Sequence, residues 1–223
     1  MFERSAGALA LAWQPSLLGD ATDGVIVGGG EPVRRHLDAS SWVDHAPGWL
    51  RGADGLFEQL LAQAEWQARD VVMWGTLLPE PRLTARWRDG ELPAALEAVR
   101  AALEQRYAVG FDSVGVNLYR DGADSVAWHR DRVGSRLREP LVATVTLGAR
   151  RRFLLRPRGG GRSVAVEPGP GDLLVMGGAC QHDWEHAVPK CATSGPRMAI
   201  TVRHLRHLRQ PVSRHPWAGR GSA

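Results

Sequence analysis

Short segments that read as β-strands, separated by glycine- and proline-rich turns, fill the second half of this 223-residue chain. Apolar and polar residues alternate there at every second position, which predicts half-buried strands. The predicted strands are 113–119, 125–131, 141–147, 152–156, 163–167, 172–176 and 197–204. Many short strands joined by such turns are typical of a β-sandwich or a barrel.

Two amphipathic helices are predicted ahead of these strands, from apolar residues at helical spacing. The residues are Leu56, Leu60, Leu61 and Ala64 in the first run, and Leu92, Leu96, Val99 and Leu103 in the second. The segment 73–87 between them is rich in aromatic and turn-forming residues and predicts a lid or a hairpin. Residues 1–50 are expected to form an irregular extension that Trp42 and Trp49 pack onto the body.

The length of the chain fits one sizeable domain, which can bury a core without disulfides or a structural metal. No apolar run approaches the roughly 20 residues that cross a bilayer, and the first residues make a weak secretory signal. We therefore expect a cytoplasmic monomer with no membrane partner. The two cysteines, Cys180 and Cys191, are expected to be free thiols.

Charge is distributed unevenly along the chain. Residues 1–129 hold 11 basic and 18 acidic groups, a formal charge of −7, whereas residues 130–223 hold 17 basic and 6 acidic groups, a formal charge of +11. A basic half of this kind is expected of a protein that binds nucleic acid, because contacts with phosphates release counterions. The run Arg150-Arg151-Arg152 within it can equally be a solvated strand end.

The segment Trp128-His129-Arg130-Asp131 contains the first candidate metal ligands. Alternate side chains of an extended segment point to the same side, so His129 and Asp131 would project together, and a later His would complete a set of three. Two His and one carboxylate are typical of non-haem Fe(II) sites. A second His-x-Asp pattern, His36-Leu37-Asp38, lies in a glycine-rich acidic stretch and is interpreted as surface structure.

Two of the predicted strands present a polar face that suits a small acid. Arg197, Thr201 and Arg203 share one side of 197–203, and Asn117 and Tyr119 share one side of 113–119. The planar, permanently charged fork of Arg binds a carboxylate through two hydrogen bonds. Arg197 and Arg203 are therefore candidates to hold a short dicarboxylic acid.

Four motifs together resemble the AlkB family in order and approximate spacing, over roughly residues 70–205. They are Asn117-x-Tyr119, Trp128-His129-x-Asp131, Asp183-Trp184-Glu185-His186 and Arg197-x5-Arg203. The resemblance implies an α+β, mainly β fold, a double-stranded β-helix or jelly roll with N-terminal helices packed on one sheet. It also implies one domain, in which the extension 1–50 is followed by helices and a nucleotide-recognition lid (51–110), a jelly-roll catalytic core (111–205) and a basic mobile tail (206–223).

The resemblance implies an Fe(II)- and 2-oxoglutarate-dependent dioxygenase that uses O2 to dealkylate N-alkylated bases. The products would be succinate, carbon dioxide and an aldehyde, and the substrate would be alkylated DNA, with RNA as an additional or true substrate. By the same resemblance, the metal ligands are His129, Asp131 and His186. The contacts to 2-oxoglutarate are Asn117, Tyr119, Arg197 and Arg203.

Base recognition follows less directly from the motifs. Enzymes that act on a base inside a strand extrude it into a pocket and stack it on an aromatic ring. Trp74 is our candidate for that ring, and Arg82 and Arg158 are candidates for phosphate or base contacts. The second residue after Asp131 is often acidic in the family, but here it is Val133, which leaves the base preference open.

Two alternatives remain at this stage. Cys180, His182, His186 and Cys191 could form a compact zinc cluster in a nucleic-acid-binding protein without enzymatic activity. That alternative leaves His129, Asp131 and the two arginines without a role. The other alternative is a dioxygenase of the same fold that acts on a substrate other than nucleic acid.

Overall fold

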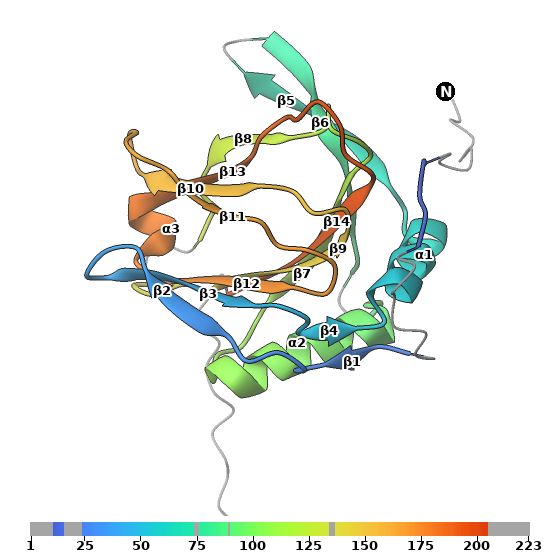
Figure 1. Ribbon diagram of the computed structural model, residues 1–223, viewed down its shortest axis with the longest axis horizontal. Coiled ribbons are helices and arrows are strands. Elements are labelled where there is room, and N and C mark those ends of the chain that lie inside the picture. The colour runs from blue at the N-terminus through green and yellow to red at the C-terminus, as the bar shows by residue number, and fades with distance from the viewer. Residues whose placement is uncertain (1–10, 16–23, 74–75, 89, 134–136, 205–223) are drawn as a thin grey trace, which may run out of the picture.

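The structure is a computed structural model that describes residues 11–15, 24–73, 76–88, 90–133 and 137–204. Trp74 and the predicted tail 206–223 lie outside these residues. Twelve strands of the described chain form two antiparallel sheets, which Figure 1 shows facing each other. This architecture agrees with the mainly β fold that the sequence predicts.

The larger sheet has eight strands, and the smaller sheet has four. The order in the larger sheet is β2 (Val33–His36), β3 (Ser41–Ala46), β12 (Leu173–Gly178), β9 (Val142–Gly148), β14 (Arg197–Arg203), β7 (Ser113–Tyr119), β6 (Thr76–Arg86) and β5 (Gln67–Met73). The order in the smaller sheet is β11 (Val164–Val166), β10 (Phe153–Pro157), β13 (Trp184–Val188) and β8 (Val126–His129). A separate pair consists of β1 (Ile26–Val27) and β4 (Leu50–Arg51).

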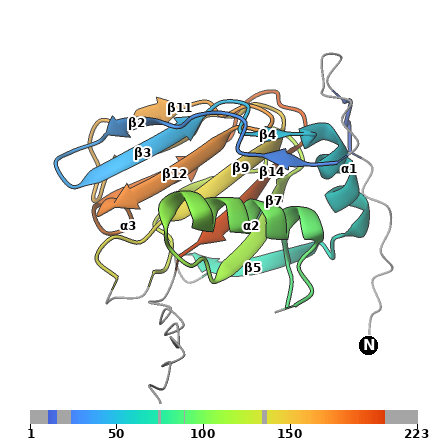
Figure 2. The same cartoon turned by 90° about the horizontal axis from the view of Figure 1, so that it is seen from below.

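Both predicted helices are present, as α1 (Ala53–Gln63) and α2 (Ala94–Tyr107), and a single turn, α3 (Cys180–Asp183), precedes β13. Figure 2 shows α2 lying across the outer face of the larger sheet. The apolar residues that predicted α2 are buried there: Leu96, Val99 and Leu103. No helix in the described part of the chain is long and apolar enough to cross a membrane.

The larger sheet separates two apolar cores, because side chains of a strand alternate between its faces. On β14, Met198, Ile200 and Val202 belong to the core under the helices, whereas Ala199 belongs to the core between the sheets. The even-numbered residues of β14 therefore pack under the helices and the odd-numbered residues face the space between the sheets, as the alternation in the sequence predicts. Arg197 shares the inner face with Ala199.

Residues 1–50 were expected to be irregular, and this expectation is wrong for the part that the structure describes. The strand β3 pairs with β12 along its whole length, from Ser41 opposite Gly178 to Ala46 opposite Leu173. Its pattern escapes a search for alternation because two polar residues, Ser41 and Asp44, are buried. Asp44 is satisfied by Arg34, whose Nε donates to its Oδ1 at 2.7 Å, and by the Tyr107 hydroxyl, which donates to its Oδ2 at 3.0 Å.

The strand β13 was also absent from the predicted strands. It has five residues, Trp-Glu-His-Ala-Val, and follows α3 without a glycine or proline turn. The segment 73–87, in contrast, was expected to form a lid or a hairpin, and β5 and β6 do form an antiparallel hairpin.

Candidate active site

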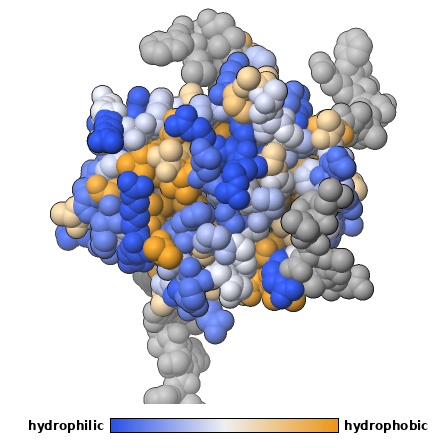
Figure 3. Space-filling model, viewed as in Figure 1, coloured by the Kyte–Doolittle hydropathy of each residue, from blue (hydrophilic) through white to orange (hydrophobic). Residues whose placement is uncertain are grey.

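A cavity of about 130 Å³ lies between the two sheets, and it is lined by strands that are far apart in the sequence. Its lining includes all seven residues that the sequence motifs single out: Asn117, Tyr119, His129, Asp131, His186, Arg197 and Arg203. On the face shown in Figure 3 the surface is mostly hydrophilic, with apolar patches between the polar side chains.

His129, Asp131 and His186 converge at one end of this cavity. Antiparallel pairing places His129 of β8 directly opposite His186 of β13, with ring centroids 4.2 Å apart. Asp131 follows β8, and its Oδ2 lies 3.4 Å from Nε2 of His186. One potential ligand atom from each residue lies within 4.8 Å of the others, and in the described part of the chain no other group of His, Cys, Asp and Glu converges in this way.

Neighbouring groups fix the orientation of the three side chains. Nδ1 of His129 lies 2.9 Å from the Ala127 carbonyl oxygen, which can only accept, so Nδ1 holds the proton and Nε2 keeps its lone pair for a metal. Arg203 donates from Nε to Oδ1 of Asp131 at 2.7 Å, which leaves Oδ2 facing the histidines. The ring of Phe153 stacks on His186 with centroids 5.3 Å apart.

Burial and charge keep these groups in the protonation states that bind a cation. Complete burial, opposed by Asp131 but helped by His129 and Arg203, lowers the pKa of His186 to about 3, so its imidazole is neutral. Burial alone would raise the pKa of Asp131, but the charge and the hydrogen bond of Arg203 outweigh burial and lower this pKa, so the carboxylate is ionised. Two imidazoles, one of them held neutral, and one carboxylate fit Fe(II) and leave coordination positions open.

Arg197 forms the opposite part of the cavity as a buried cation without a carboxylate partner among the described residues. Its side chain is 1% exposed, and its Nη2 donates to the Thr146 hydroxyl at 3.2 Å. Its Nε and Nη1 are buried without a partner, and burial lowers the pKa of this guanidinium. Because buried donors are rarely left unpaired, these nitrogens fit the distal carboxylate of a bound dicarboxylic acid such as 2-oxoglutarate.

Sheet register places the remaining predicted contacts around this guanidinium. Tyr119 of β7 lies opposite Arg197 of β14, and the guanidinium carbon lies 5.2 Å from the centre of the Tyr119 ring. Asn117 lies two residues before Tyr119 on β7, between Ala199 of β14 on one side and Thr84 of β6 on the other. The alternation in 113–119 and 197–203 therefore predicts the layout of this wall.

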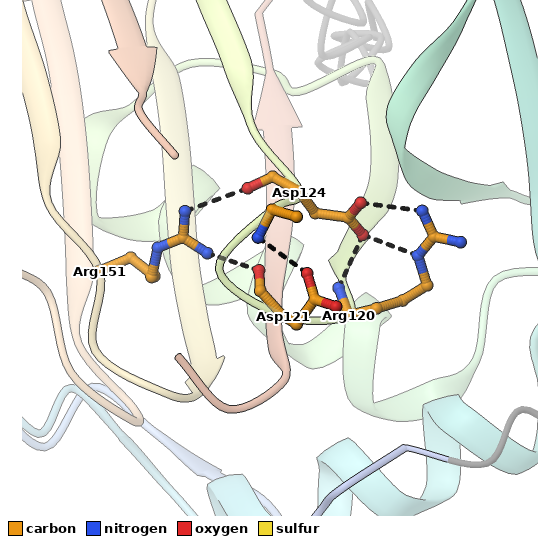
Figure 4. Close-up of polar contacts among 5 residues, drawn as sticks. Arg120, Asp121, Asp124 and Arg151 are labelled. Carbon is orange, nitrogen blue, oxygen red and sulfur yellow. Dashed lines mark hydrogen bonds and ion pairs between the residues drawn. The ribbon is translucent and has the colours of Figure 1, made fainter. Parts of the chain in front are cut away.

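A network of hydrogen bonds holds the loop that connects β7 to β8, and with it the position of His129. Figure 4 shows the guanidinium of Arg151 donating to the backbone carbonyls of Asp121 at 2.9 Å and Asp124 at 3.0 Å. A third bond, to the Pro189 carbonyl at 2.6 Å, ties this loop to the chain after β13. Arg151 is 4% exposed, so the interpretation of this residue as a solvated strand end is wrong.

The candidate substrate contacts have different outcomes. Arg82 lines the cavity. Val133 is half-buried but is not part of the lining, and Arg158 is an exposed residue after β10 whose N–H donates to the Asp183 carbonyl at 2.7 Å. Neither of these two residues lines the cavity, and their roles as substrate contacts stay predictions. Trp74 lies outside the described residues.

The four residues of the zinc alternative do not come together. Nε2 of His182 lies 2.8 Å from the Leu137 carbonyl oxygen, so it donates a proton there, and Cys180 is buried while Cys191 is exposed. His186 is shared with the other candidate set and converges with His129 and Asp131 instead. The zinc interpretation is therefore wrong for these residues.

Several residues of the site were not predicted. Gln181 of α3 accepts the Asp131 N–H at 3.1 Å, and Arg69, Glu80, Thr84 and Arg86 line the cavity from the hairpin β5–β6. None of these residues belongs to a motif. The only signal in the sequence is the alternation of the polar residues Glu80, Arg82, Thr84 and Arg86, and Pro81 argues against a strand in that segment.

Comparisons with known proteins agree with this geometry. The family model of the 2OG-Fe(II) oxygenase superfamily matches residues 79–207. The alpha-ketoglutarate-dependent dioxygenase alkB homolog 3 of Bos taurus is 35% identical over 179 residues, which cover 69% of this chain and 62% of that protein. The DNA oxidative demethylase ALKBH2 of Mus musculus is 27% identical over 179 residues, which cover 69% of this chain and 75% of that protein. The chain thus spans about 62% of the length of the bovine relative.

A solved structure shows the same fold at low sequence identity. A prolyl hydroxylase from Trichoplax adhaerens, in complex with a peptide fragment of the oxygen degradation domain of hypoxia inducible factor, superposes with a TM-score of 0.55 at 12% identity. The match covers 73% of this chain and 83% of that chain. At this identity the likeness concerns the fold alone, and it confirms the expected jelly roll.

Proposed function

We propose that this chain, which belongs to the 2OG-Fe(II) oxygenase superfamily and is homologous to the AlkB dioxygenases, removes alkyl groups from nitrogen atoms of nucleic-acid bases. The proposed substrate is alkylated DNA, with RNA as an additional substrate. The proposed products are the restored base, an aldehyde, succinate and carbon dioxide.

One observation carries the proposal: a facial set of metal ligands and an unpaired buried guanidinium lie in the same cavity. His129, Asp131 and His186 would hold Fe(II), and Arg197 would hold the distal carboxylate of 2-oxoglutarate. When bound, Fe(II), 2-oxoglutarate and O2 supply an oxidant that hydroxylates the carbon attached to nitrogen. The hydroxyalkyl group then leaves as an aldehyde, and the nitrogen recovers its original bonding.

The residues of this chain position the reactants and exclude water. Arg203 keeps Oδ1 of Asp131 occupied, so that this carboxylate offers the metal a single oxygen, Oδ2. Asn117 and Tyr119 line the wall beside Arg197 and would orient the co-substrate. The neutral His186, packed against Phe153, closes the floor of the site against solvent.

The choice of nucleic acid as substrate is supported by charge and by the relatives. The basic half of the chain, with a formal charge of +11 over residues 130–223, is the half that contains the proposed metal ligands His186 and Asp131. The murine relative is a DNA oxidative demethylase. Both observations favour a polyanionic substrate over a protein substrate.

The proposal is tested by following two products at once. Purified protein is incubated with Fe(II), 2-oxoglutarate, O2 and a panel of single-stranded oligonucleotides that each contain one methylated base. We expect succinate to form in step with the loss of a methyl group, measured by mass spectrometry of the oligonucleotide. His129→Ala and Asp131→Ala should abolish both signals.

Two results would contradict the proposal in different ways. Succinate without any loss of methyl groups across the panel would point to a dioxygenase with another substrate. Normal turnover by His129→Ala would contradict the assignment of the metal site itself.

A further inference from the structure

The segment that carries Asp131 lies beyond the end of a strand. The strand β8 ends at His129, and its pairing with β13 also ends there, with His129 opposite His186. Residues 130–133, which follow, have no regular secondary structure. Strand pairing therefore fixes the backbone of His129, and the backbone of Asp131 is held by other contacts.

A side chain of α3 provides one such contact. Oε1 of Gln181 accepts the Asp131 N–H at 3.1 Å, so this amide takes the place that a backbone carbonyl would have in a longer strand. Gln181 is 2% exposed, and its Nε2 donates to Sδ of Met176 at 3.6 Å. Because a backbone N–H only donates, the oxygen of the amide must face Asp131 and its nitrogen must face Met176.

The turn α3 is itself anchored to another part of the fold. Figure 1 shows it at one end of the two sheets, where the chain passes from β12 of the larger sheet to β13 of the smaller one. The Ala179 N–H donates to the Ser40 carbonyl at 2.9 Å, and the Trp184 indole donates to Oδ2 of Asp38 at 2.6 Å. Both bonds join α3 to the connection between β2 and β3, so Gln181 projects from a supported turn.

Two further bonds join α3 to the chain around Asp131. Nη1 of Arg130 donates to the His182 carbonyl at 3.2 Å, and Nε2 of His182 donates to the Leu137 carbonyl at 2.8 Å. These bonds hold residues on either side of Asp131. The bond from Gln181 differs from them because it acts on the candidate metal ligand itself.

We propose that Gln181 is a positioning residue for the metal, which keeps Oδ2 of Asp131 directed at the two histidines by holding the backbone of Asp131. Arg203 holds Oδ1 of the same carboxylate at 2.7 Å, so Asp131 is fixed at its backbone and at its side chain. With the side-chain bond alone, the backbone could shift while Oδ1 stays on Arg203, and Oδ2 would then turn away from the metal. This inference rests on the metal site of the proposed function and does not depend on the identity of the substrate.

Gln181→Leu tests this role, because leucine fills a similar space beside Met176 but cannot accept the Asp131 N–H. Electron paramagnetic resonance of free Mn(II) measures the affinity of the protein for the metal, and calorimetric titration at saturating Mn(II) measures the affinity for 2-oxoglutarate. We expect the variant to bind Mn(II) about 10- to 100-fold more weakly, since contacts that orient a metal ligand typically have effects of this size. Its affinity for 2-oxoglutarate should stay that of the wild type, because Arg197 is unchanged.

Val99→Ala is the matched control for a loss of stability. Val99 is buried on α2, in the core on the other face of the larger sheet. Both variants should unfold at a lower temperature than the wild type, but Val99→Ala should bind Mn(II) with normal affinity. Normal Mn(II) affinity of Gln181→Leu, or an equal loss of affinity for Mn(II) and for 2-oxoglutarate, would overturn the positioning role.

Hydrogen exchange in the wild type tests the bond without any variant. The Asp131 amide hydrogen should exchange with solvent more slowly than in an unfolded peptide, as followed by NMR on the metal-free protein, because its donor is engaged by Gln181. Exchange at the rate of an unfolded peptide would overturn the proposal even if Gln181→Leu did not fold.

Failure of the proposed function would look different. A wild type that binds no Mn(II) would overturn both the metal site and the role of Gln181. If Gln181→Leu loses Mn(II) affinity as expected but the wild type removes no methyl group from the oligonucleotide panel, dealkylation fails and the role of Gln181 stands.

Discussion

Arg197 is a buried cation without a counter-charge among the described residues. Its replacement is therefore expected to affect the stability of the protein and the binding of 2-oxoglutarate in opposite ways. Replacement by Met should leave the free energy of unfolding of the ligand-free protein unchanged or raised, because an uncompensated buried charge costs free energy. The same change should weaken 2-oxoglutarate binding by about 10- to 100-fold, since it removes hydrogen bonds to a carboxylate. Urea unfolding and calorimetric titration with Mn(II) present measure the two effects.

Arg106→Met serves as the control for this substitution, because Arg106 lies on α2 and its ion pair with Glu31 is exposed. It should change neither quantity by much. If Arg197→Met bound 2-oxoglutarate with normal affinity, the assignment of this guanidinium to the distal carboxylate would be wrong.

Asp38 gives a prediction for the dependence of stability on pH. Although burial alone would raise its pKa, hydrogen bonds from the Trp184 indole and from the N–H groups of Ser40 and Ser41 lower it to about 2. A carboxyl group with a pKa below its unfolded value of about 3.9 stabilises the fold above that pH and loses this contribution as the pH falls toward 2. The stability of Asp38→Ala should therefore fall less steeply than that of the wild type between pH 4 and pH 2.

At neutral pH the same variant should be less stable by about 1–3 kcal/mol, because the Trp184 indole N–H is buried and loses its acceptor. Unfolding in urea at several pH values measures both effects. Parallel curves for Asp38→Ala and the wild type below pH 4 would contradict the assignment.

Single residues differ in how far the sequence could predict their roles. His129 and Asp131 were predictable because an extended segment brings residues two apart onto one side, and Arg197 and Arg203 because their strand alternates. Gln181 and Glu80 were not, because each contacts the site through an irregular element, a single helical turn and a bulge. The choice of His186 over His182 depended on the family motif, since either could follow from spacing alone.

At the scale of elements, the loop between β7 and β8 depends on Arg151. Its replacement by Ala would leave three backbone carbonyls without their donor, at Asp121, Asp124 and Pro189. We expect a loss of about 2–4 kcal/mol in the free energy of unfolding, measured by denaturant titration. The loop also approaches the chain after β13 closely, since a Cβ on Gly122 would lie 2.3 Å from the Cys191 carbonyl oxygen.

The neighbouring Arg152 provides a control with the same chemistry. Its side chain is 60% exposed and lies 3.8 Å from Glu167, so Arg152→Ala should cost less than about 1 kcal/mol. Equal losses in the two variants would mean that the carbonyl contacts of Arg151 contribute nothing beyond surface charge.

The elements themselves were predicted where one face of a strand or helix is apolar. The strand β7 was predicted with its observed bounds, and α1 and α2 were found from apolar spacing. Strands β3 and β13 were missed because their inward residues include Asp44 and His186, polar groups whose partners come from distant parts of the chain. Burial of a polar residue cannot be predicted before those partners are known.

At the scale of the whole molecule, the basic half of the chain should govern binding to nucleic acid. Exposed arginines of this half include Arg130, Arg132, Arg138, Arg158 and Arg162. If they contact phosphates, the affinity for single-stranded DNA should fall steeply with salt, and each Arg→Ala change at a phosphate contact should reduce the slope of log K against log salt by roughly 0.7. Anisotropy titrations from low to moderate salt measure this slope.

Two exposed arginines of the acidic half, Arg35 and Arg88, serve as controls. Their replacement should leave the slope unchanged. A slope near zero for the wild type would argue against a polyanionic substrate.

The position of the hairpin β5–β6 has a consequence for how such a protein could diversify. Among the strands that the structure describes, its outer strand β5 pairs with β6 alone, and the proposed metal ligands His129 and His186 lie on the other sheet. Exchange of residues 67–86 for the equivalent hairpin of a relative would therefore replace one wall of the cavity and leave the proposed metal ligands in place. Substrate preference could in this way change in evolution independently of the metal site, through exchange of the hairpin.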